Sequence, residues 1–446
     1  MTYLRRLLIL VVLVIPVMAL AAACDILQLG NEAQPTPTPT ATVSATAAAP
    51  TVPQIDQPVT VTQPVSQLRV WIPPEIGART QASAEVLANQ IQAFNTRYPE
   101  LEIVVERKSI DGPGGIISYL RTGQPVAPGI LPDLIALPAE DLAEPAVQEL
   151  VYPLDPFIDE ASLVDFYPAS TAYAQMDSGI LGYPFAITDL SHLVYASDLV
   201  TETVPLRWSQ FISGTENTLL LPADSREGAL FGLQYYLAEG GSLVNEAGQP
   251  DLELDPLVSA LENIAAGKPN LLQSHQLKSL EEAWQLYQLG ASNHVWTRSD
   301  YLLGERALLE GDTPIGQAGR GFAAVPGPNG PLVPLTNAWL WSVTTPEAPR
   351  QAVATELLLY LTESENLEAW TAVSRVLPPR RDVVATFSES DPYFSFVGQE
   401  LERAETFPVA ATDAMMDALG SAVFEVLATD DSPQAIAERT IAAFRQ

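Results

Sequence analysis

Apolar and polar residues alternate with two different periods between residues 68 and 137. Leu68, Val70 and Ile72 share one face of the segment LRVWI, which is the period of a β-strand, whereas the next segment repeats apolar residues at helical spacing. The elements expected here are strands at 68–72, 101–106 and 132–137 and helices at 81–97 and 116–121. Strands that alternate with helices at this spacing predict right-handed crossovers and a mostly parallel sheet, so the expected fold class is α/β.

A long apolar run, SGILGYPFAITDLSHLVYASDLV at residues 178–200, is interrupted by Gly179, Gly182 and Pro184. Proline cannot donate to a sheet ladder and lies at strand edges, first residues or bulges, so we expect the strand to bend at this point. We interpret the run as a strand that leaves one packed unit, bends and enters another. Ligand clefts tend to form at such domain interfaces.

The remainder of the chain is predicted to be mostly helical. Helices are expected at 225–241, 257–266, 279–289, 349–361, 412–427 and from Ser432 onward. Residues 335–343 have a strand pattern that places Trp339 and Trp341 on one face. The glycine- and proline-rich residues 311–331 contain PGPNGP, which is expected to be an exposed turn, and LPPRRDV from Leu377 is expected to be a polar connection.

The first residues of the chain have the order of an export signal. Basic residues at 5–6 precede an apolar run at 7–20 and small residues at 21–23. Cys24 is the only cysteine, and its position resembles that of the lipidated cysteine in bacterial lipoproteins, although Ala21 stands where that signal usually has leucine. We therefore expect a lipid-anchored protein; an uncleaved signal anchor and ordinary signal cleavage are the alternatives.

Composition distinguishes a tether from the folded part of the chain, and net charge argues against two classes of partner, nucleic acids and anionic membranes. Residues 25–66 are rich in proline, threonine and alanine and show no apolar period, so we expect a disordered, extended tether. The chain has 54 acidic and 22 basic residues, a formal net charge of −32. Such a charge argues against nucleic acid and against anionic membrane surfaces as electrostatic partners.

From residue 68 onward, the order of several sequence blocks resembles that of the ABC-transporter extracellular solute-binding proteins, family 1, the group that includes maltose-binding protein. The blocks are LRVWI, NTRYPELEIVVE, PDLIAL, SGILGYPFAITDLSHLVYASDLV, GASNHVWTRSDYL, GFAAVPGPNG, NAWLWSVTTPEAPRQAVATELLLYLTESENLEAW, VLPPRRDV and DSPQAIAERTIAAF. Two features depart from the family pattern. Asn337 and Ala338 precede Trp339 where relatives often carry a glycine pair, and Pro73-Pro74-Glu75 is not a typical polar contact loop.

The resemblance implies a two-lobe periplasmic-binding-protein fold with mixed sheets, hinge crossovers and a ligand cleft between the lobes. The implied organisation is a lipoprotein signal peptide at 1–24 ending at lipidated Cys24, a tether at 25–66, a first lobe at 67–187 and 337–373, and a second lobe at 188–336 and 374–446. Members capture a solute by hinge closure and deliver it to a membrane permease. The expected protein is a monomer on the extracytoplasmic face of the cell membrane, with a carbohydrate ligand and no cofactor or metal.

Nine residues are candidates for ligand binding, eight of them in these blocks and Glu140 in the loop after PDLIAL. Sugars present flat C–H faces that pack on aromatic rings, and their hydroxyls need carboxylates and amides as hydrogen-bond partners. The candidates are Glu140, Tyr183, Phe185, Asp189, Trp296, Arg298, Tyr301, Trp339 and Trp341. For each aromatic residue alone, core packing is the simpler interpretation, and we expect at least two of the rings to line the cleft.

Several charged residues have a second interpretation. Asp141 and Glu144 follow a strand, where they are equally explained as charges at a helix N-terminus. Arg298 is alternatively a surface partner of a neighbouring acid, which contributes little. Arg380 and Arg381 follow a proline pair, and a solvated turn explains them better than an anionic ligand.

The sequence contains no motif of a common enzyme class. GxSxG, HExxH and GxxxxGK[ST] are missing, and the three histidines, His192, His275 and His294, are scattered. We therefore expect a binding protein and not an enzyme. The alternatives are a receptor for a peptide, a polyamine or a phosphate ester, a surface sensor or adhesin without a transporter, and a glycosidase, which needs only two carboxylates.

Overall fold

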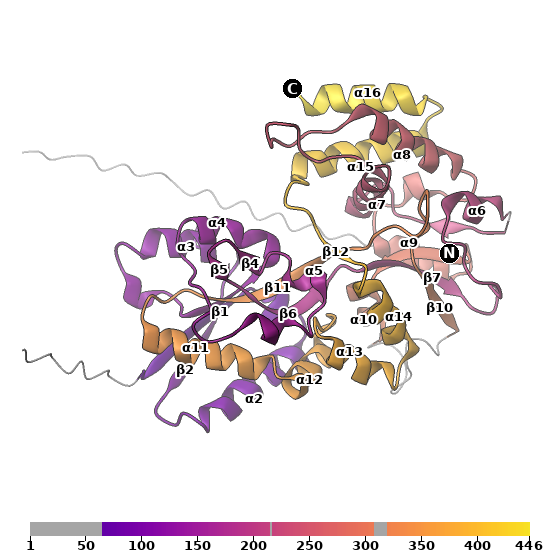
Figure 1. The fold of residues 1–446 in the computed structure, drawn as a ribbon. Coiled ribbons are helices and arrows are strands. Elements are labelled where there is room, and N and C mark those ends of the chain that lie inside the picture. Colours follow the sequence, from indigo (N-terminus) through magenta and orange to yellow (C-terminus); the bar gives the residue numbers. More distant parts are fainter. Residues whose placement is uncertain (1–64, 215, 307–318) are drawn as a thin grey trace, which may run out of the picture. The chain divides into compact units, whose positions relative to one another are not determined.

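The computed structural model describes residues 65–214, 216–306 and 319–446, which form two larger sheets flanked by helices (Figure 1). The signal peptide, Cys24 and nearly all of the expected tether lie outside the described residues. The helices are α1 Pro74–Gly77, α2 Gln81–Asn95, α3 Ile116–Gly123, α4 Ala143–Val147, α5 Pro168–Thr171, α6 Trp208–Ser213, α7 Arg226–Ala238, α8 Leu254–Ala266, α9 Leu280–Gln288, α10 Ser299–Arg306, α11 Ala348–Leu361, α12 Ser364–Ser374, α13 Arg381–Ser388, α14 Pro392–Leu401, α15 Asp413–Ala428 and α16 Pro433–Phe444.

The first sheet is mixed and has the order β12-β11-β3-β1-β2, with β6 paired to β11. Its strands are β1 Gln67–Ile72, β2 Glu102–Arg107, β3 Leu134–Pro138, β6 Tyr183–Thr188, β11 Leu335–Val343 and β12 Glu405–Thr406. Strand β1 is parallel to β2 and β3, whereas β11 is antiparallel to β3 and β6. The strands expected near 68–72, 101–106, 132–137 and 335–343 are confirmed.

Two cores, one on each face of the first sheet, explain why β3 reads as a continuous apolar run. Leu134 and Ala136 belong to the core that contains residues of α2, α11 and α12, and Ile135 and Leu137 belong to the core that contains residues of α3. Helices therefore cover both faces of the sheet (Figure 1). A strand buried on both faces needs apolar residues at every position.

The second sheet has the order β10-β7-β9-β8. Its strands are β7 Ser191–Ala196, β8 Leu219–Leu220, β9 His294–Arg298 and β10 Arg320–Ala323, and a separate pair consists of β4 Gln175–Met176 and β5 Gly179–Ile180. Leu193 and Trp296 pack in a core with residues of α7, α8, α15 and α16. Val194 and Val295 pack in another core with residues of α9, α10, α13 and α14. This sheet is also buried on both faces.

The passage between the two sheets falls at Asp189 and Leu190, close to the bound after residue 187 that the resemblance implies, whereas the bend expected at Pro184 does not take the chain out of the first sheet. Pro184 lies inside β6 and pairs with Leu340, next to a register shift in β11. Such irregular positions tolerate proline because no ladder hydrogen bond is required there. The break comes instead at Asp189, whose φ of 67° is in the left-handed region.

Two expectations about connections are wrong. The PGPNGP segment is not an exposed turn throughout: Pro326 and Gly327 are buried and only Asn329 is exposed. The LPPRRDV segment is also largely buried, since Leu377 is fully buried and pairs with Ile187. Both segments reach the core through backbone contacts that no hydrophobic period in the sequence encodes.

The bounds of the two lobes remain a prediction. The strand pairing shows that two segments assigned to the second lobe belong to the first sheet. Strand β12 comes from the segment assigned to the second lobe but pairs with Leu335 and Thr336 of β11 in the first sheet. Those two residues were also assigned to the second lobe. The chain therefore connects the two sheets at β11 and β12 as well as at Asp189.

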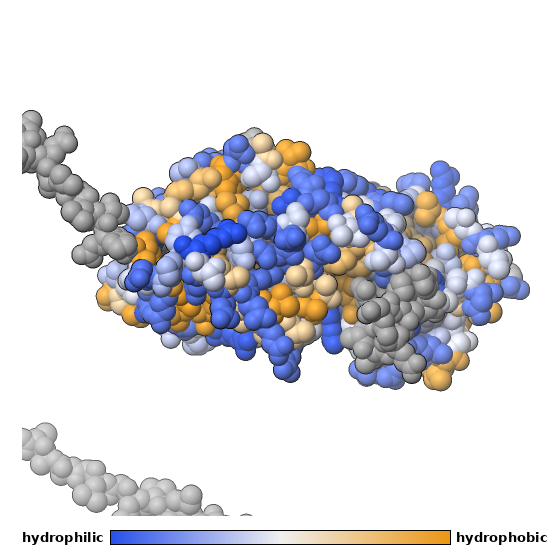
Figure 2. All heavy atoms as spheres, turned by 90° about the horizontal axis from the view of Figure 1, so that it is seen from below, coloured by the Kyte–Doolittle hydropathy of each residue, from blue (hydrophilic) through white to orange (hydrophobic). Residues whose placement is uncertain are grey.

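Hydrophilic residues cover much of the face shown in Figure 2, with hydrophobic residues interspersed among them. Among residues 65–214, 216–306 and 319–446, no helix combines the length and apolar character needed to cross a membrane. Several of the described helices, among them α2, α9 and α16, begin with a side-chain cap. Ser432 is the predicted cap of α16, and its hydroxyl accepts a hydrogen bond from the Ala435 amide.

One ion pair ties the centre of the first sheet to its covering helix α11. Arg350 donates from Nε and Nη2 to the two carboxylate oxygens of Asp133, at 2.6 Å each, and the Arg69 amide donates to the same carboxylate at 2.8 Å. The Asp133 side chain is only 3% exposed. Its charge therefore depends on the arginine for compensation.

Replacing Arg350 by methionine is expected to lower the free energy of unfolding by about 3 kcal/mol, because it leaves a buried carboxylate without its cation. Urea denaturation of the full chain measures this loss. The matched control is Arg121→Met, which removes the exposed pair with Glu144 and is expected to cost less than about 1 kcal/mol. Equal losses in the two variants would contradict the role assigned to Arg350.

Candidate functional site

A cavity of about 310 Å³ lies where the chain passes between the two sheets. Its lining residues are Asp189, Arg226, Glu227, Leu230, Arg298, Leu335, Asn337, Phe407 and Met416. They come from the crossing itself, from β9 and α7 on the side of the second sheet, from β11 of the first sheet, and from α15. Two of the predicted site residues, Asp189 and Arg298, are therefore brought together here.

Backbone pairing explains how residues 109 positions apart meet. Strands β7 and β9 are antiparallel, and their register pairs Ser191 with Arg298. Asp189 lies two residues before that pair, and Arg298 Nη1 donates to its Oδ1 at 2.8 Å. The third polar group is Asn337, whose Nδ2 donates to Asp189 Oδ2 at 3.1 Å.

Helix α7 supplies Arg226 and Glu227 from its first turn. Ser225 is the N-cap, and its hydroxyl accepts a hydrogen bond from the Glu227 amide. Gly228 allows the preceding loop to lie close to this turn, because a Cβ there would be 2.3 Å from the Ala223 carbonyl oxygen. The cap and the glycine together fix the two charged side chains at the edge of the cavity.

Arg298 is surrounded by three carboxylates. Besides the contact with Asp189, its Nε is 3.6 Å from Asp300 Oδ1 and its Nη2 is 3.9 Å from Glu227 Oε1. Burial lowers the pKa of Arg298, but the carboxylates of Asp300, Asp189 and Glu227 outweigh that effect and raise it. The guanidinium is consequently charged at all accessible pH values, and it donates a hydrogen bond to Asp189 while Asp300 and Glu227 act on it as ion-pair partners.

Asp300 is the most enclosed of these carboxylates, with a side chain that is 12% exposed. Burial and the nearby Asp189 carboxylate raise its pKa, while Arg298 and Arg79 lower it. Arg79 Nη2 donates to Asp300 Oδ2 at 3.1 Å, although Arg79 comes from the loop between α1 and α2 in the first part of the fold. This cluster of charged side chains therefore combines Arg79 from the first part of the fold with Arg298 and Asp300 from the second.

Glu140 lies at the end of β3, in a single helical turn at Ala139–Asp141. Its Oε2 is buried and has no hydrogen-bond partner among the described residues. Burial raises the pKa of Glu140 to about 7, its own backbone amide lowers it, and Asp141 and Asp189 add to the rise. Since Arg226 also acts on Glu140, the carboxyl belongs to the electrostatic surroundings of the cavity without lining it.

The other two acids after β3 fit the helix interpretation. Asp141 and Glu144 lie in the first turns of consecutive short helices. Burial raises the pKa of Asp141 to about 6, with contributions from Asp111 and Glu144. Glu144 forms an ion pair with Arg121.

Four of the predicted aromatic residues share one core of the first sheet: Tyr183, Phe185, Trp339 and Trp341. Their exposed fractions are between 3% and 8%, and Phe185 stacks on Trp341 with ring centroids 4.7 Å apart. Trp296 is fully buried in a core of the second sheet. Tyr301 is half-buried beside Trp284. None of these six rings is among the residues that line the cavity, although Trp296 shares a core with Leu230, Leu335 and Met416, which do line it.

The arginines after the proline pair are ion-paired. Arg380 contacts Asp165 and Asp382, and Arg381 contacts Glu402. The sequence suggested a solvated turn or an anion site for these two arginines. Neither interpretation included their acidic partners, because Asp165 is distant in the chain and Asp382 and Glu402 follow the turn. The two arginines hold α13 against neighbouring segments.

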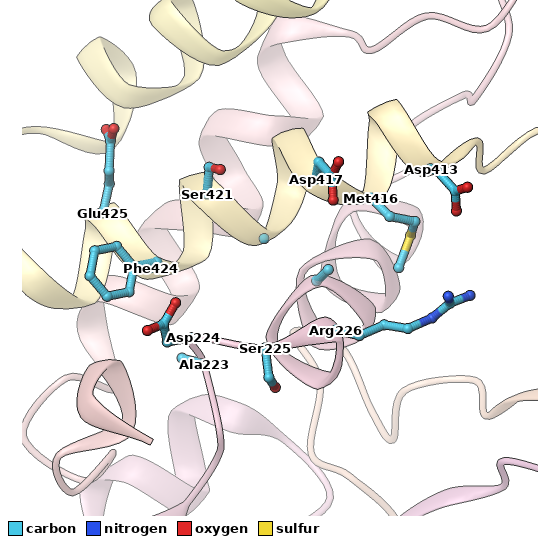
Figure 3. A pocket seen from close by; sticks show the side chains of 12 residues that line it. Ala223, Asp224, Ser225, Arg226, Asp413, Met416, Asp417, Ser421, Phe424 and Glu425 are labelled. Carbon is cyan, nitrogen blue, oxygen red and sulfur yellow. The ribbon is translucent and has the colours of Figure 1, made fainter. Parts of the chain in front are cut away.

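A groove of about 680 Å³ adjoins the cavity and shares Arg226 and Met416 with it. Helix α15 forms one wall with Asp413, Asp417, Ser421 and Glu425, which are spaced at four residues along one face (Figure 3). The opposite wall is formed by α7 and the loop before it, which contribute Asp224 and Ser225. Sequence periodicity showed that α15 has an apolar face but did not show that its polar face lines a groove.

No histidine is among the residues that line the cavity. Burial lowers the pKa of both His192 and His294 to about 4, so both are neutral at pH 7. Within the described ranges, no three His, Cys, Asp or Glu side chains are grouped so that they could hold a metal ion.

The pKa of Glu140 makes stability depend on pH. The folded chain keeps a proton that the unfolded chain releases near pH 4.5, so stability is lost as the pH rises from 4.5 to about 7. The loss amounts to about 3 kcal/mol at pH 8. Glu140→Gln is expected to remove it, so that the variant is more stable than the wild type at pH 8 and similar to it at pH 4.5.

Urea denaturation across this pH range measures the difference between the two proteins. The matched control is Glu438→Gln on the exposed side of α16, which should follow the wild-type profile at every pH. A Glu140→Gln profile parallel to that of the wild type would contradict the burial of this carboxyl.

Comparison with known proteins gives a family match and a set of structural matches. The model of a family described as bacterial extracellular solute-binding protein matches residues 89–394. No curated protein matches the chain in sequence. The solved structures include the sugar-binding protein MalE from Xanthomonas citri, with 18% identity and a TM-score of 0.66, covering 85% of this chain and 96% of that one.

Two further structures have the same fold. The cyclic α-maltosyl-1,6-maltose binding protein from Arthrobacter globiformis has 15% identity and a TM-score of 0.64, covering 85% of this chain and 99% of that one. Maltose-bound MalE3 of T. maritima has 17% identity and a TM-score of 0.60, with the same coverages. These matches confirm the predicted two-lobe α/β fold of periplasmic binding proteins. With the family match over residues 89–394, the chain belongs to the bacterial extracellular solute-binding proteins.

Proposed function

We propose that the chain is a carbohydrate receptor that captures a sugar or oligosaccharide in the cavity around Asp189 and Arg298. The observation that carries this proposal is the convergence of a carboxylate, a guanidinium and an amide, from Asp189, Arg298 and Asn337, at the crossing between the sheets. These groups supply the donors and acceptors that sugar hydroxyls require. The structural relatives named above, which are described as sugar- or maltose-binding, support the same ligand class.

The position of the cavity supports capture by hinge closure. Asn337 belongs to a strand of the first sheet and Arg298 to a strand of the second, and Asp189 lies on the segment between them. A ligand that contacts both sheets stabilises the arrangement in which those contacts coexist, and so it shifts a hinge equilibrium.

The same proposal includes delivery and location. We infer that the receptor is held by a lipid on Cys24 at the extracytoplasmic face of the membrane and works as a monomer. It passes its ligand to an ABC permease and catalyses no reaction. The family supports an extracytoplasmic binding role, and the order of basic, apolar and small residues before Cys24 supports the lipid anchor. Of the nine predicted ligand residues, Asp189 and Arg298 contact the ligand directly. The other seven support the cavity from outside its lining: Glu140, Tyr183, Phe185, Trp296, Tyr301, Trp339 and Trp341.

A cationic solute such as a polyamine is the second candidate ligand. Asp224, Asp413, Asp417 and Glu425 line the adjoining groove, where Arg226 is the only basic residue in the lining. Several carboxylates on one wall favour a ligand with positive charge. A polyamine and a neutral sugar are readily distinguished, because only binding of the polyamine weakens strongly as salt is added.

The test is a titration of the full chain with a panel of sugars, polyamines, peptides and phosphate esters, followed by tryptophan fluorescence and melting temperature. A sugar at 100 times its Kd is expected to stabilise the fold by about 2.7 kcal/mol. Asn337→Ala should weaken that sugar about tenfold to a hundredfold, because it removes an amide and leaves Asp189 with one donor fewer.

The matched control is Asn329→Ala, an exposed turn residue outside the cavity, which should bind like the wild type. A response to polyamines alone would replace the carbohydrate proposal by the second candidate. Turnover of a glycoside by the purified chain would contradict the assignment as a binding protein.

A further inference from the structure

A line of alternating charges connects the loop after β1 to the crossing between the sheets. Arg79 Nη2 is 3.1 Å from Asp300 Oδ2, Asp300 Oδ1 is 3.6 Å from Arg298 Nε, and Arg298 Nη1 is 2.8 Å from Asp189 Oδ1. Asn337 completes the line from the first sheet with its hydrogen bond to Asp189. Each acid in this line contacts two side chains from different elements, Asp300 through one hydrogen bond and one ion pair and Asp189 through two hydrogen bonds.

Arg79, like Asp300, lies outside the cavity lining. It comes from the loop that joins α1 to α2, and its neighbour Thr80 fixes that loop as the cap of α2. The Thr80 hydroxyl also donates to the Val373 carbonyl at 2.9 Å. The loop is therefore anchored to the first part of the fold, while Asp300 belongs to α10, directly after a strand of the second sheet.

Charge balance makes the contribution of Arg79 necessary. Without it, Arg298 would be the one basic side chain of the described residues in ion-pair contact with Asp189, Glu227 and Asp300. Arg79 brings a second cation to the most enclosed of these, with side chains that are 26% and 12% exposed for Arg79 and Asp300. An ion pair with this degree of burial is screened less by salt than one on the open surface.

We propose that Arg79 and Asp300 form an electrostatic latch that holds the loop after β1 against α10 and sets the equilibrium of the hinge. In the latched arrangement Asp300 also acts as a positioning residue for Arg298, because its second oxygen faces Nε of that arginine. When Arg79 withdraws, the ion pair that joins the loop before α2 to α10 is lost, and separation of the two parts is favoured. The latch rests on the hinge of the proposed function but not on the identity of the ligand.

The latch is tested by a distance measurement that needs no ligand. Spin labels at Val126→Cys and Leu289→Cys, both at least 80% exposed and on opposite parts of the fold, report the separation in the full chain carrying Cys24→Ala. Raising the salt from about 0.05 M to about 1 M screens the pair and should populate a second distance. Arg79→Gln at low salt should increase that second population about threefold to fivefold, the factor that an ion pair of this kind contributes.

Three controls make the outcome decisive. Arg79→Lys keeps the charge and should retain the wild-type distances. Arg121→Gln removes an ion pair that does not join the two sheets and should change nothing. Identical distances and identical salt responses in Arg79→Gln and the wild type would overturn the latch. Because sugar titration of the wild type is independent of these distances, the latch and the carbohydrate proposal fail separately.

Discussion

Asp189 carries the connection between the two sheets in a backbone conformation that a residue with a side chain seldom adopts. A φ of 67° at a residue other than glycine is unfavourable unless neighbouring groups hold it. The carboxylate supplies that support by accepting hydrogen bonds from Thr188 Oγ1, Asn337 Nδ2 and Arg298 Nη1. Because these donors come from three strands, the group that stabilises the crossing is also the polar centre of the cavity.

This arrangement divides the work between apolar and polar residues. The large rings of Tyr183, Phe185, Trp339 and Trp341 pack together where β6 meets β11. In the proposed function, recognition falls to Asp189, Arg298 and Asn337, which are held by hydrogen bonds to one another. Polar groups placed in this way are preorganised, so that little ordering remains to be done when a ligand binds.

The sequence predicted the sheets and helices well because their signals are local. The period of residues 68–72 and the N-cap at Ser432 both appear in the structure where they were expected. The pairing of Asp189 with Arg298 was not predicted, since it depends on the register of β7 and β9; the two residues were predicted only as separate candidates. Trp339 and Trp341 share a face of β11, as predicted. Whether that face meets the core depends on the pairing of β11 with β6, and no local sequence pattern reveals this pairing.

Hydrogen–deuterium exchange of the full chain, with and without the sugar that most raises its melting temperature, tests the central claim most directly. The claim is that one ligand bridges the two sheets at the crossing. It predicts that the bound sugar slows exchange in four segments at once: 186–192, 226–230, 296–300 and 335–339. These segments contain seven of the nine residues that line the cavity. Slower exchange in segments of only one sheet, or at a surface away from all four segments, would contradict it.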